Sequence, residues 1–263
     1  MKVALVYKDS QEAIKSAEIL ALELNKIAET TCVDFREARA LIKNPPKLVV
    51  AIGGDGTFLS ASRIFCPLGV AVVGVNQGRF GFLTEFTLNE AIEDIKAILQ
   101  GKLRALRRSM LRVSLGERVI GDVLNDAVLS RKSLSRILQV QVQIQSEQAL
   151  SVRGDGIIVS TATGSTAYSL SAGGPILHPT LDAILLVPIC PHSLTSRPLV
   201  LPKDVRIYLS AQSEAYLTLD GQEGVELMPN EVVAVELSPF ECLTYPNPRR
   251  GFFALLHEKL RWG

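Results

Sequence analysis

The sequence predicts two domains of different class: an α/β N-terminal domain with a parallel, Rossmann-like sheet, then an antiparallel all-β C-terminal domain. Within the first hundred residues, fully apolar strands alternate with helical stretches, which is typical of a parallel sheet covered on both faces. After Gly101, strands follow one another without helices, and apolar and polar residues alternate strictly over 139–145. Such alternation indicates strands with one buried and one solvated face.

The expected boundaries are 1–100 for the α/β domain and 101–248 for the β-rich domain. The last segment, 249–263, contains a helical stretch at 252–260 that is apolar on one side. We therefore expect this segment to pack back on the first domain, where its apolar side would be buried.

The individual elements follow from the hydrophobic pattern and from the residues that bound each run. Thr87 and Glu90 form a capping-box motif that starts a helix, and Gly101 provides its stop. The other elements of the first domain are expected at 3–7 (strand), 10–28 (helix), 48–52 (strand), a helical stretch up to 65, and 70–75 (strand). In the second domain, strands are expected at 111–115, 118–129, 138–145, 205–210, 215–219 and 232–237.

Composition excludes several classes of function. The chain has 263 residues, 47% apolar and 21% charged, and a formal net charge of +1. This balance is typical of a soluble globular protein and provides no electrostatic footprint for nucleic acid. No run approaches the ~20 apolar residues that span a bilayer, and four scattered cysteines without a CxxC pair argue against a disulfide framework or zinc site. We expect a cytoplasmic protein with no nucleic-acid or membrane partner.

A glycine-rich run, Gly53-Gly54-Asp55-Gly56-Thr57, directly follows the apolar strand 48–52. Loops at the carboxyl ends of parallel strands are where open α/β sheets bind ligands, and glycines let the backbone approach a phosphate closely. The helix that starts at Thr57 adds a favourable dipole. Because a carboxylate repels phosphate, Asp55 is better suited to accept a proton from an attacking hydroxyl or to help hold a phosphate-bound metal. The alternative is a tight turn in which Asp55 caps the helix.

Residues 153–175 are dense in Ser, Thr and Gly, yet they include the apolar run Ile157-Ile158-Val159. This combination favours a pocket lining, in which hydroxyl and backbone groups bind ribose or amide groups and Tyr168 offers its ring to a base. The alternative is a capped helix of small residues that packs closely against a sheet.

Three shorter features carry polar residues at places where a site or a turn is expected. Asn125-Asp126 interrupts an apolar strand, and since buried polar groups need partners, the pair marks a site, a bulge or a turn. Asp220-Gly221-Gln222 is typical of a hairpin turn. The run Gly78-Arg79-Phe80-Gly81-Phe82-Leu83 follows the strand 70–75, so it too lies at the carboxyl end of a strand.

Taken in this order, the segments resemble those of NAD kinases, the enzymes that phosphorylate NAD to NADP. The glycine run alone is shared with lipid kinases and phosphofructokinases, whereas Thr-Gly-Ser-Thr-Ala-Tyr-Ser-Leu-Ser-Ala-Gly-Gly-Pro at 163–175 is close to diagnostic of the family. The resemblance extends from about Lys47 to Gln222 and includes 53–57, 78–84, 125–126, 154–156, 163–175 and 220–222.

The resemblance implies that Asp55 is the general base that deprotonates the adenosine 2′-hydroxyl of NAD. It also implies that Asn125 and Asp126 bind ribose hydroxyls, that Asp155 holds the nicotinamide end with Arg153 nearby, and that Phe82 lies beside the adenine. The residues implied in binding are Gly53, Gly54, Asp55, Gly56, Thr57, Phe82, Asn125, Asp126, Arg153, Asp155, Thr166, Ala167, Tyr168, Ser169, Leu170, Ser171, Cys190 and Gln222.

The resemblance further implies an oligomer, expected to be a homodimer or homotetramer, in which a neighbouring subunit completes the pocket; Cys190 is the candidate for that contribution. The substrates would be NAD and ATP or another phosphoryl donor. No residue is expected to ligate a metal, because a divalent ion, Mg²⁺, would be carried by the donor phosphates. Two positions depart from the family: Asp126 stands where many members have Glu, and Ala162 where many have Pro.

Two other functions share part of this pattern. A lipid kinase of the diacylglycerol or sphingosine type has the glycine loop and a two-domain plan, but it needs an apolar slot for acyl chains, whereas the second half of this chain offers hydroxyl groups. A non-catalytic dinucleotide sensor would bind NAD without forming NADP, and it would not need a base beside the glycine loop.

Overall fold

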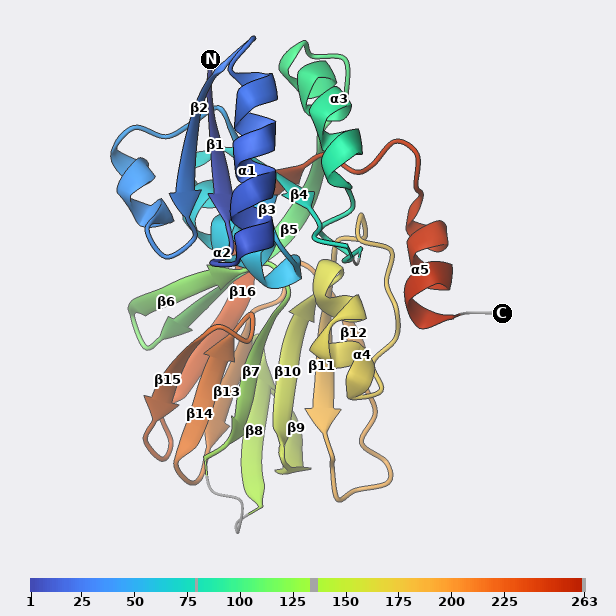
Figure 1. Cartoon of the computed structure of the whole chain (residues 1–263). Helices are drawn as coiled ribbons and strands as arrows, with labels where there is room; N and C mark the ends of the chain where they lie inside the picture. Colours follow the sequence, from blue (N-terminus) through green and yellow to red (C-terminus); the bar gives the residue numbers. More distant parts are fainter. Residues whose placement is uncertain (79, 133–136, 262–263) are drawn as a thin grey trace. The chain divides into compact units, whose positions relative to one another are not determined.

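The computed structural model describes residues 1–78, 80–132 and 137–261 and divides into two compact units (Figure 1). Unit one comprises Met1–Arg107 and Glu241–Gly263, and unit two comprises Arg108–Phe240. The chain passes from one unit to the other within two strands, β5 (Leu106–Leu115) and β16 (Val232–Thr244). Among the helices of the described ranges, none is long and apolar enough to cross a membrane.

Unit one is built on a parallel sheet with the strand order β2-β1-β3-β4. The last residue of β16, Thr244, pairs in parallel with Val72 of β4. The elements of this unit are β1 (Lys2–Tyr7), α1 (Gln11–Leu24), β2 (Glu29–Asp34), η1 (Ala38–Lys43), β3 (Leu48–Ile52), α2 (Asp55–Phe65), η2 (Cys66–Leu68), β4 (Ala71–Val75), α3 (Leu88–Leu99) and α5 (Phe252–Leu260).

The core of unit one explains why its central strands are apolar throughout. Helices α1 and α3 lie side by side on one face of the sheet (Figure 1), where Leu20 and Ile95 pack against alternate strand residues such as Val50 and Val73. Helix α2 also contacts β3 and β4, and every residue of these two strands is buried. The continuous apolar runs are therefore those of strands covered on both faces, as predicted.

The helix boundaries follow local side-chain chemistry. The predicted capping box is present at α3: Thr87 Oγ1 accepts from the Glu90 N–H at 3.3 Å, and Glu90 Oε2 accepts from the Thr87 N–H at 2.8 Å. Gly101, the predicted stop, has a φ of +71°. Helix α1 ends at Leu24 rather than at residue 28, because the side chain of Asn25 accepts hydrogen bonds from the N–H and hydroxyl of Thr30, and the chain turns into β2.

Unit two contains two antiparallel sheets. One has the order β16-β13-β8-β9, with β5 pairing with β16 and β6, and the other has the order β12-β11-β10-β7-β14-β15. Its elements besides β5 and β16 are β6 (Arg118–Val123), β7 (Asp126–Arg131), β8 (Leu138–Ile144), β9 (Glu147–Gly154), β10 (Gly156–Thr161), η3 (Thr163–Thr166), α4 (Tyr168–Ser171), β11 (Ala183–Ile189), β12 (Leu199–Pro202), β13 (Ile207–Ala211), β14 (Ala215–Leu219) and β15 (Glu223–Leu227).

The two sheets of unit two share one apolar core. Val140 and Val142 of β8 are buried in it, whereas the glutamines that alternate with them are more exposed, as the sequence predicts. Strand β10 is buried on both faces: Ile157 and Val159 belong to the shared core, while Ile158 packs in a second cluster with Leu177 and neighbouring strands. The apolar part of the predicted pocket segment is therefore a central strand.

The predicted fold class is confirmed, with a parallel sheet in the N-terminal part and antiparallel sheets in the C-terminal part. The predicted strand 118–129 is two strands, β6 and β7, separated at Leu124–Asn125. Arg79, part of the loop expected after the strand 70–75, lies outside the described residues.

Gly74→Ala should lower the free energy of unfolding by about 1–3 kcal/mol, because overpacking displaces backbone. A Cβ at residue 74 would lie 2.3 Å from the Leu83 carbonyl oxygen and 2.7 Å from the Thr84 Cα. Gly251→Ala is the matched control, since a Cβ there meets no atom within 4 Å. Urea denaturation measures both variants, and equal effects would contradict the close approach of β4 to residues 83–84.

Candidate active site

The glycine loop leaves β3 beside the loop that leaves β4, because the two strands are parallel neighbours with Ile52 opposite Val75. The Gly53 N–H donates to the Val75 carbonyl at 2.9 Å, which ties the two loops together at their start. A Cβ on Gly53 would lie 2.4 Å from Oγ1 of the buried Thr57, whereas a Cβ on the exposed Gly54 would meet no atom within 4 Å. The loop is therefore close-packed at Gly53 and open at Gly54.

The half-buried side chain of Asp55, the first residue of α2, turns toward the loop that follows β4. Its Oδ2 accepts a hydrogen bond from the Phe82 N–H at 2.9 Å. Its Oδ1 accepts from the Leu83 N–H at 3.1 Å, the Thr84 N–H at 3.0 Å and Thr84 Oγ1 at 3.0 Å. An ionised carboxylate has about four lone-pair positions, two on each oxygen. Among the described residues, donors therefore fill the acceptor positions of Oδ1, while Oδ2 accepts one hydrogen bond and keeps one position open.

Gly81 makes room for this carboxylate. A Cβ at residue 81 would lie 1.8 Å from Asp55 Oδ1 and 2.5 Å from Asp55 Cγ. The sequence pattern predicts that this loop lies at a strand's carboxyl end, but it does not identify Gly81, Leu83 and Thr84 as neighbours of Asp55. The signal that was available is the glycine itself, because its position at the end of a neighbouring parallel strand is where a close approach to the glycine loop is expected.

Unit two contains a pocket of about 330 Å³ that joins several of the predicted residues. Its lining combines carboxyl, amide and hydroxyl groups with apolar side-chain surface, and it follows one face of β7 from Asp126 through Val128 to Ser130. The lining residues are Asn125, Asp126, Val128, Ser130, Ala167, Tyr168, Thr218, Asp220 and Gly221.

The turn residue Asp220 fixes the backbone of Asn125-Asp126. Asp220 is buried with a φ of +49°, and its carboxylate accepts from the N–H groups of Leu124 at 3.2 Å, Asn125 at 2.8 Å and Asp126 at 3.2 Å. On the other side, the Asn125 carbonyl accepts from Ser160 Oγ at 3.0 Å. The predicted hairpin turn is thus present between β14 and β15. It also holds the backbone of residues 124–126, which the local pattern does not predict.

Asp126 is the acidic group of this pocket that lacks partners. Its side chain is buried, and the described residues donate no hydrogen bond to its carboxylate. Burial, followed by the nearby charge of Asp220, raises the pKa of Asp126 from its ordinary value to about 7. A buried acceptor that faces a pocket without a donor is suited to a ligand that brings hydroxyl groups.

The hydroxyl-rich segment after β10 uses many of its groups internally. Thr161 Oγ1 donates to the Leu124 carbonyl at 2.6 Å, and the buried Ser169 Oγ donates to the Gly164 carbonyl at 3.0 Å. Of the predicted lining 166–171, Ala167 and Tyr168 line the pocket, with Tyr168 47% exposed. The Thr166 hydroxyl donates to the Thr163 carbonyl at 3.3 Å. The packing alternative therefore accounts for Ser169, while Leu170 and Ser171 lie outside the lining of this pocket.

Arg153, Asp155 and Cys190 lie together at the other end of β10. Asp155 Oδ1 is 3.1 Å from Arg131 Nε, the Asp155 N–H donates to the carbonyl that precedes Cys190, and Arg153 accepts from the backbone shortly after it. Asp126 pairs with Ser160, five residues further along, so Asp155 and Asp126 are roughly 16 Å apart at a strand rise of about 3.3 Å per residue. Gln222 follows Gly221 in the turn and is exposed.

Metal-binding groups do not gather in either unit. Within 1–78, 80–132 and 137–261, no three His, Cys, Asp or Glu side chains are placed as a metal site would require. The four cysteines are free thiols.

Asp126→Asn should stabilise the fold more at high pH than at low pH. Because the folded state holds a proton on Asp126 up to about pH 7, whereas the unfolded chain releases it near pH 3.8, stability is lost as the pH rises through that window. Asn cannot ionise, so the difference in unfolding free energy between variant and wild type should grow by roughly 2–3 kcal/mol from pH 5 to pH 8.

Urea denaturation at the two pH values measures this difference. Asp204→Asn, at an exposed aspartate, is the control and should show the same small difference at both. A difference for Asp126→Asn that does not change with pH would mean that the buried carboxyl is already ionised in the folded protein at pH 5.

Two family models match the chain, and together they include most of it. The ATP-NAD kinase N-terminal domain matches residues 6–103, and the ATP-NAD kinase C-terminal domain matches residues 124–246. These ranges contain the Asp55 network and the pocket of unit two, respectively.

Similar proteins and structures point the same way. An NAD kinase from Aquifex aeolicus is 46% identical over 100% of this chain and 99% of the relative, and one from Trichlorobacter lovleyi is 41% identical over 84% of this chain and 81% of the relative. An Archaeoglobus fulgidus NAD kinase, solved in complex with ATP, has a TM-score of 0.85 at 27% identity, with 100% of both chains covered. A yeast NADH kinase complexed with NADH shares the fold, with a TM-score of 0.90 at 24% identity over 100% of this chain and 88% of that one. Since both family models match and a relative is 46% identical over the full length, this chain belongs to the NAD kinase family and is a kinase.

Proposed function

We propose that this enzyme transfers the terminal phosphoryl group of ATP to the adenosine 2′-hydroxyl of NAD, with Asp55 as general base. The observation that carries the proposal is that Asp55 Oδ2 accepts one hydrogen bond from the described residues and so keeps an acceptor position open. Asp55 begins α2, beside the exposed glycines of the loop. A base needs such a free lone pair within hydrogen-bond reach of the attacking hydroxyl.

The bonds from Phe82, Leu83 and Thr84 orient the carboxylate before substrate arrives. Placement matters more than basicity here, because phosphoryl transfer passes through a loose transition state in which the nucleophile bonds late. The 2′-hydroxyl becomes acidic as its oxygen bonds to phosphorus, and Oδ2 then takes the proton. Asp55 would supply about 10²–10⁴-fold of the rate in this role.

The pocket of unit two is the proposed site for a ribose of NAD. The Asp126 carboxylate, which lacks donors among the described residues, would accept ribose hydroxyl groups, and the Asn125 side chain would add a donor and an acceptor. The half-exposed Tyr168 would stack on a base. Asp155, at the far end of β10, would bind the nicotinamide end, as an extended dinucleotide requires separate contacts for its two ends.

ATP is the proposed donor, bound through its phosphates at the glycine loop. The exposed Gly54 leaves space for a phosphate, and α2 directs its N-terminus at this loop. The similar Archaeoglobus NAD kinase structure was solved with ATP. Mg²⁺ would arrive with the donor phosphates and offset their charge, since this ion commonly takes water and substrate phosphate as ligands.

A homo-oligomer is also proposed, with Cys190 contributing to a neighbouring subunit's pocket. Cys190 is exposed and has a φ of +43°, unusual for a residue with a side chain. Its thiol is therefore held outward at the end of β11, close to Arg153 and Asp155 along the backbone pairing.

Asp55→Asn should reduce kcat by about 10²–10⁴-fold and leave the Kd for NAD within a few-fold, because the amide cannot take the proton. Thr84→Val is the control: it removes one bond to Oδ1 and keeps the carboxylate, so kcat should stay within a few-fold of wild type. Steady-state kinetics and calorimetric NAD binding measure both variants. An Asn variant with near-normal turnover would exclude Asp55 as the base.

Incubation with NAD, Mg²⁺ and ATP should yield NADP, detected with an NADP-specific dehydrogenase, and diacylglycerol should not be labelled. The carboxyl, amide and hydroxyl groups in the lining of the unit two pocket match the hydroxyl groups of a ribose better than an acyl chain. Other triphosphates, polyphosphate and NADH in parallel assays define donor and acceptor range. NAD binding without NADP at any donor or metal concentration would instead identify a dinucleotide sensor.

A further inference from the structure

The segment that follows β16 binds the same stretch of chain that holds Asp55. Asn247 is buried, and its backbone N–H donates to Glu85 Oε2 at 3.0 Å. Its side-chain Nδ2 donates to the Glu85 carbonyl at 3.1 Å. Glu85 directly follows Thr84, whose N–H and hydroxyl bind Asp55. The residue that the C-terminal segment contacts is thus the one that directly follows the Asp55 network.

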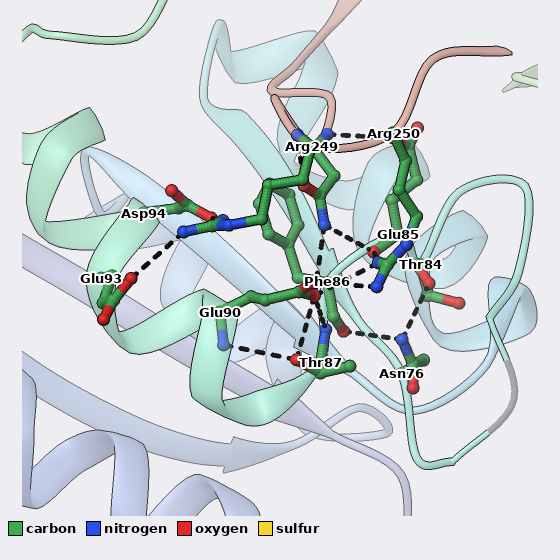
Figure 2. Close-up of polar contacts among 11 residues, drawn as sticks. Asn76, Thr84, Glu85, Phe86, Thr87, Glu90, Glu93, Asp94, Arg249 and Arg250 are labelled. Carbon is green, nitrogen blue, oxygen red and sulfur yellow. Dashed lines mark hydrogen bonds and ion pairs between the residues drawn. The ribbon is translucent and has the colours of Figure 1, made fainter. Parts of the chain in front are cut away.

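Arg250, whose contacts with Glu85 and Glu90 are drawn in Figure 2, binds on both sides of the three residues that donate to Asp55. After them, Arg250 Nη1 donates to the Glu85 carbonyl at 2.9 Å. Before them, the guanidinium lies over the Phe80 ring, 3.8 Å from its centroid. A cation stacked on one residue and bonded to another, five positions later, limits how far the backbone between them can move.

Glu90 anchors Arg250 to the start of α3. Arg250 Nη2 donates to Glu90 Oε1 at 2.9 Å and Nη1 to Oε2 at 3.2 Å, a two-nitrogen contact that fixes the plane of the guanidinium. Burial acts to raise the pKa of Glu90, but hydrogen bonds from Thr87 and Arg250 outweigh it and lower the pKa. Glu90 therefore stays ionised, and its place in the α3 capping box makes it a fixed anchor.

We propose that Arg250 is a positioning residue for Asp55: it holds segment 80–85 so that the Phe82, Leu83 and Thr84 N–H groups meet the Asp55 carboxylate. The inference rests on the proposed role of Asp55 for its effect on turnover. It extends that role to the C-terminal segment, which is distant in sequence from the glycine loop and absent from the residues that the family resemblance implied.

Arg249 provides the comparison that distinguishes positioning of segment 80–85 from a general attachment of the C-terminal segment to α3. Its guanidinium binds Asp94, and also Glu93 at 3.1 Å, both on α3 (Figure 2). Among the described residues, its side chain has no hydrogen bond or ion pair with segment 80–85. The two neighbouring arginines thus form comparable ion pairs with the same helix, but only Arg250 also reaches the loop.

The experiment compares Arg250→Gln with Arg249→Gln in the full chain. Both variants should lose a similar amount of thermal stability. Arg250→Gln alone should lower kcat by about 10-fold or more, with KM for NAD changed only a few-fold, because small misplacement of a catalytic group slows chemistry. It should also speed hydrogen exchange of the Phe82, Leu83 and Thr84 amides by roughly 10-fold or more, since those amides are protected by Asp55.

Arg250→Lys provides a second variant if Arg250→Gln does not fold. It keeps the charge but loses the two-nitrogen contact, so kcat and amide exchange should fall between wild type and the Gln variant. If kcat and exchange at residues 82–84 in Arg250→Gln match those of Arg249→Gln, Arg250 only fastens the chain end and the proposal is wrong. If instead the wild type forms no NADP, the proposed function fails, and the exchange comparison still decides whether Arg250 positions the loop.

Discussion

The Asp55 carboxylate accepts four hydrogen bonds from residues 82–84, and the arrangement of both loops at this edge of unit one follows from those bonds. Where β3 and β4 end, their backbone groups lose the pairing that the sheet provided, and a charged acceptor replaces it with stronger bonds. The absence of a side chain at Gly81 is what allows the carboxylate so close. The two loops therefore behave as one structure, and displacement of either one displaces the other.

Unit two fixes its polar residues in the same way. The Asp220 carboxylate accepts hydrogen bonds from three backbone N–H groups and so determines where Asn125 and Asp126 lie. Asp126 then has a fixed backbone but a carboxyl group without donors among the described residues. Two neighbouring aspartates repel each other when both are ionised. The three N–H donors stabilise the ionised form of Asp220, whereas no such donors stabilise that of Asp126 among the described residues. This asymmetry, rather than the presence of acidic residues, is the reason for proposing that Asp126 binds a ligand.

Local patterns predicted the fold class, most helices and the α3 capping box, because each depends on residues within one or two turns of one another. The pattern does not predict strand β2, since its sequence Glu-Thr-Thr-Cys-Val-Asp at the edge of the sheet is largely polar. It places the residues of strand β10 in a binding segment because hydroxyls surround them. The bonds from residues 82–84 to Asp55 join positions 27 to 29 apart, and the bond from Asn125 to Asp220 joins positions 95 apart, so no local pattern contains them.

The two oxygens of Asp55 have different roles in the structure and in the proposed reaction. Oδ1 accepts three hydrogen bonds that hold the loop, so removing it would release the loop. Among the described residues Oδ2 accepts one, and its other position is the one that the proposed function assigns to the substrate hydroxyl. A change at Asp55 therefore combines two effects, loss of a proton acceptor and loss of loop geometry, and turnover alone does not separate them. The Thr84 hydroxyl and Arg250 act on the geometry without touching Oδ2. The loss of kcat in variants of these two residues measures the contribution of loop geometry. The additional loss of kcat in Asp55→Asn then measures the contribution of proton transfer.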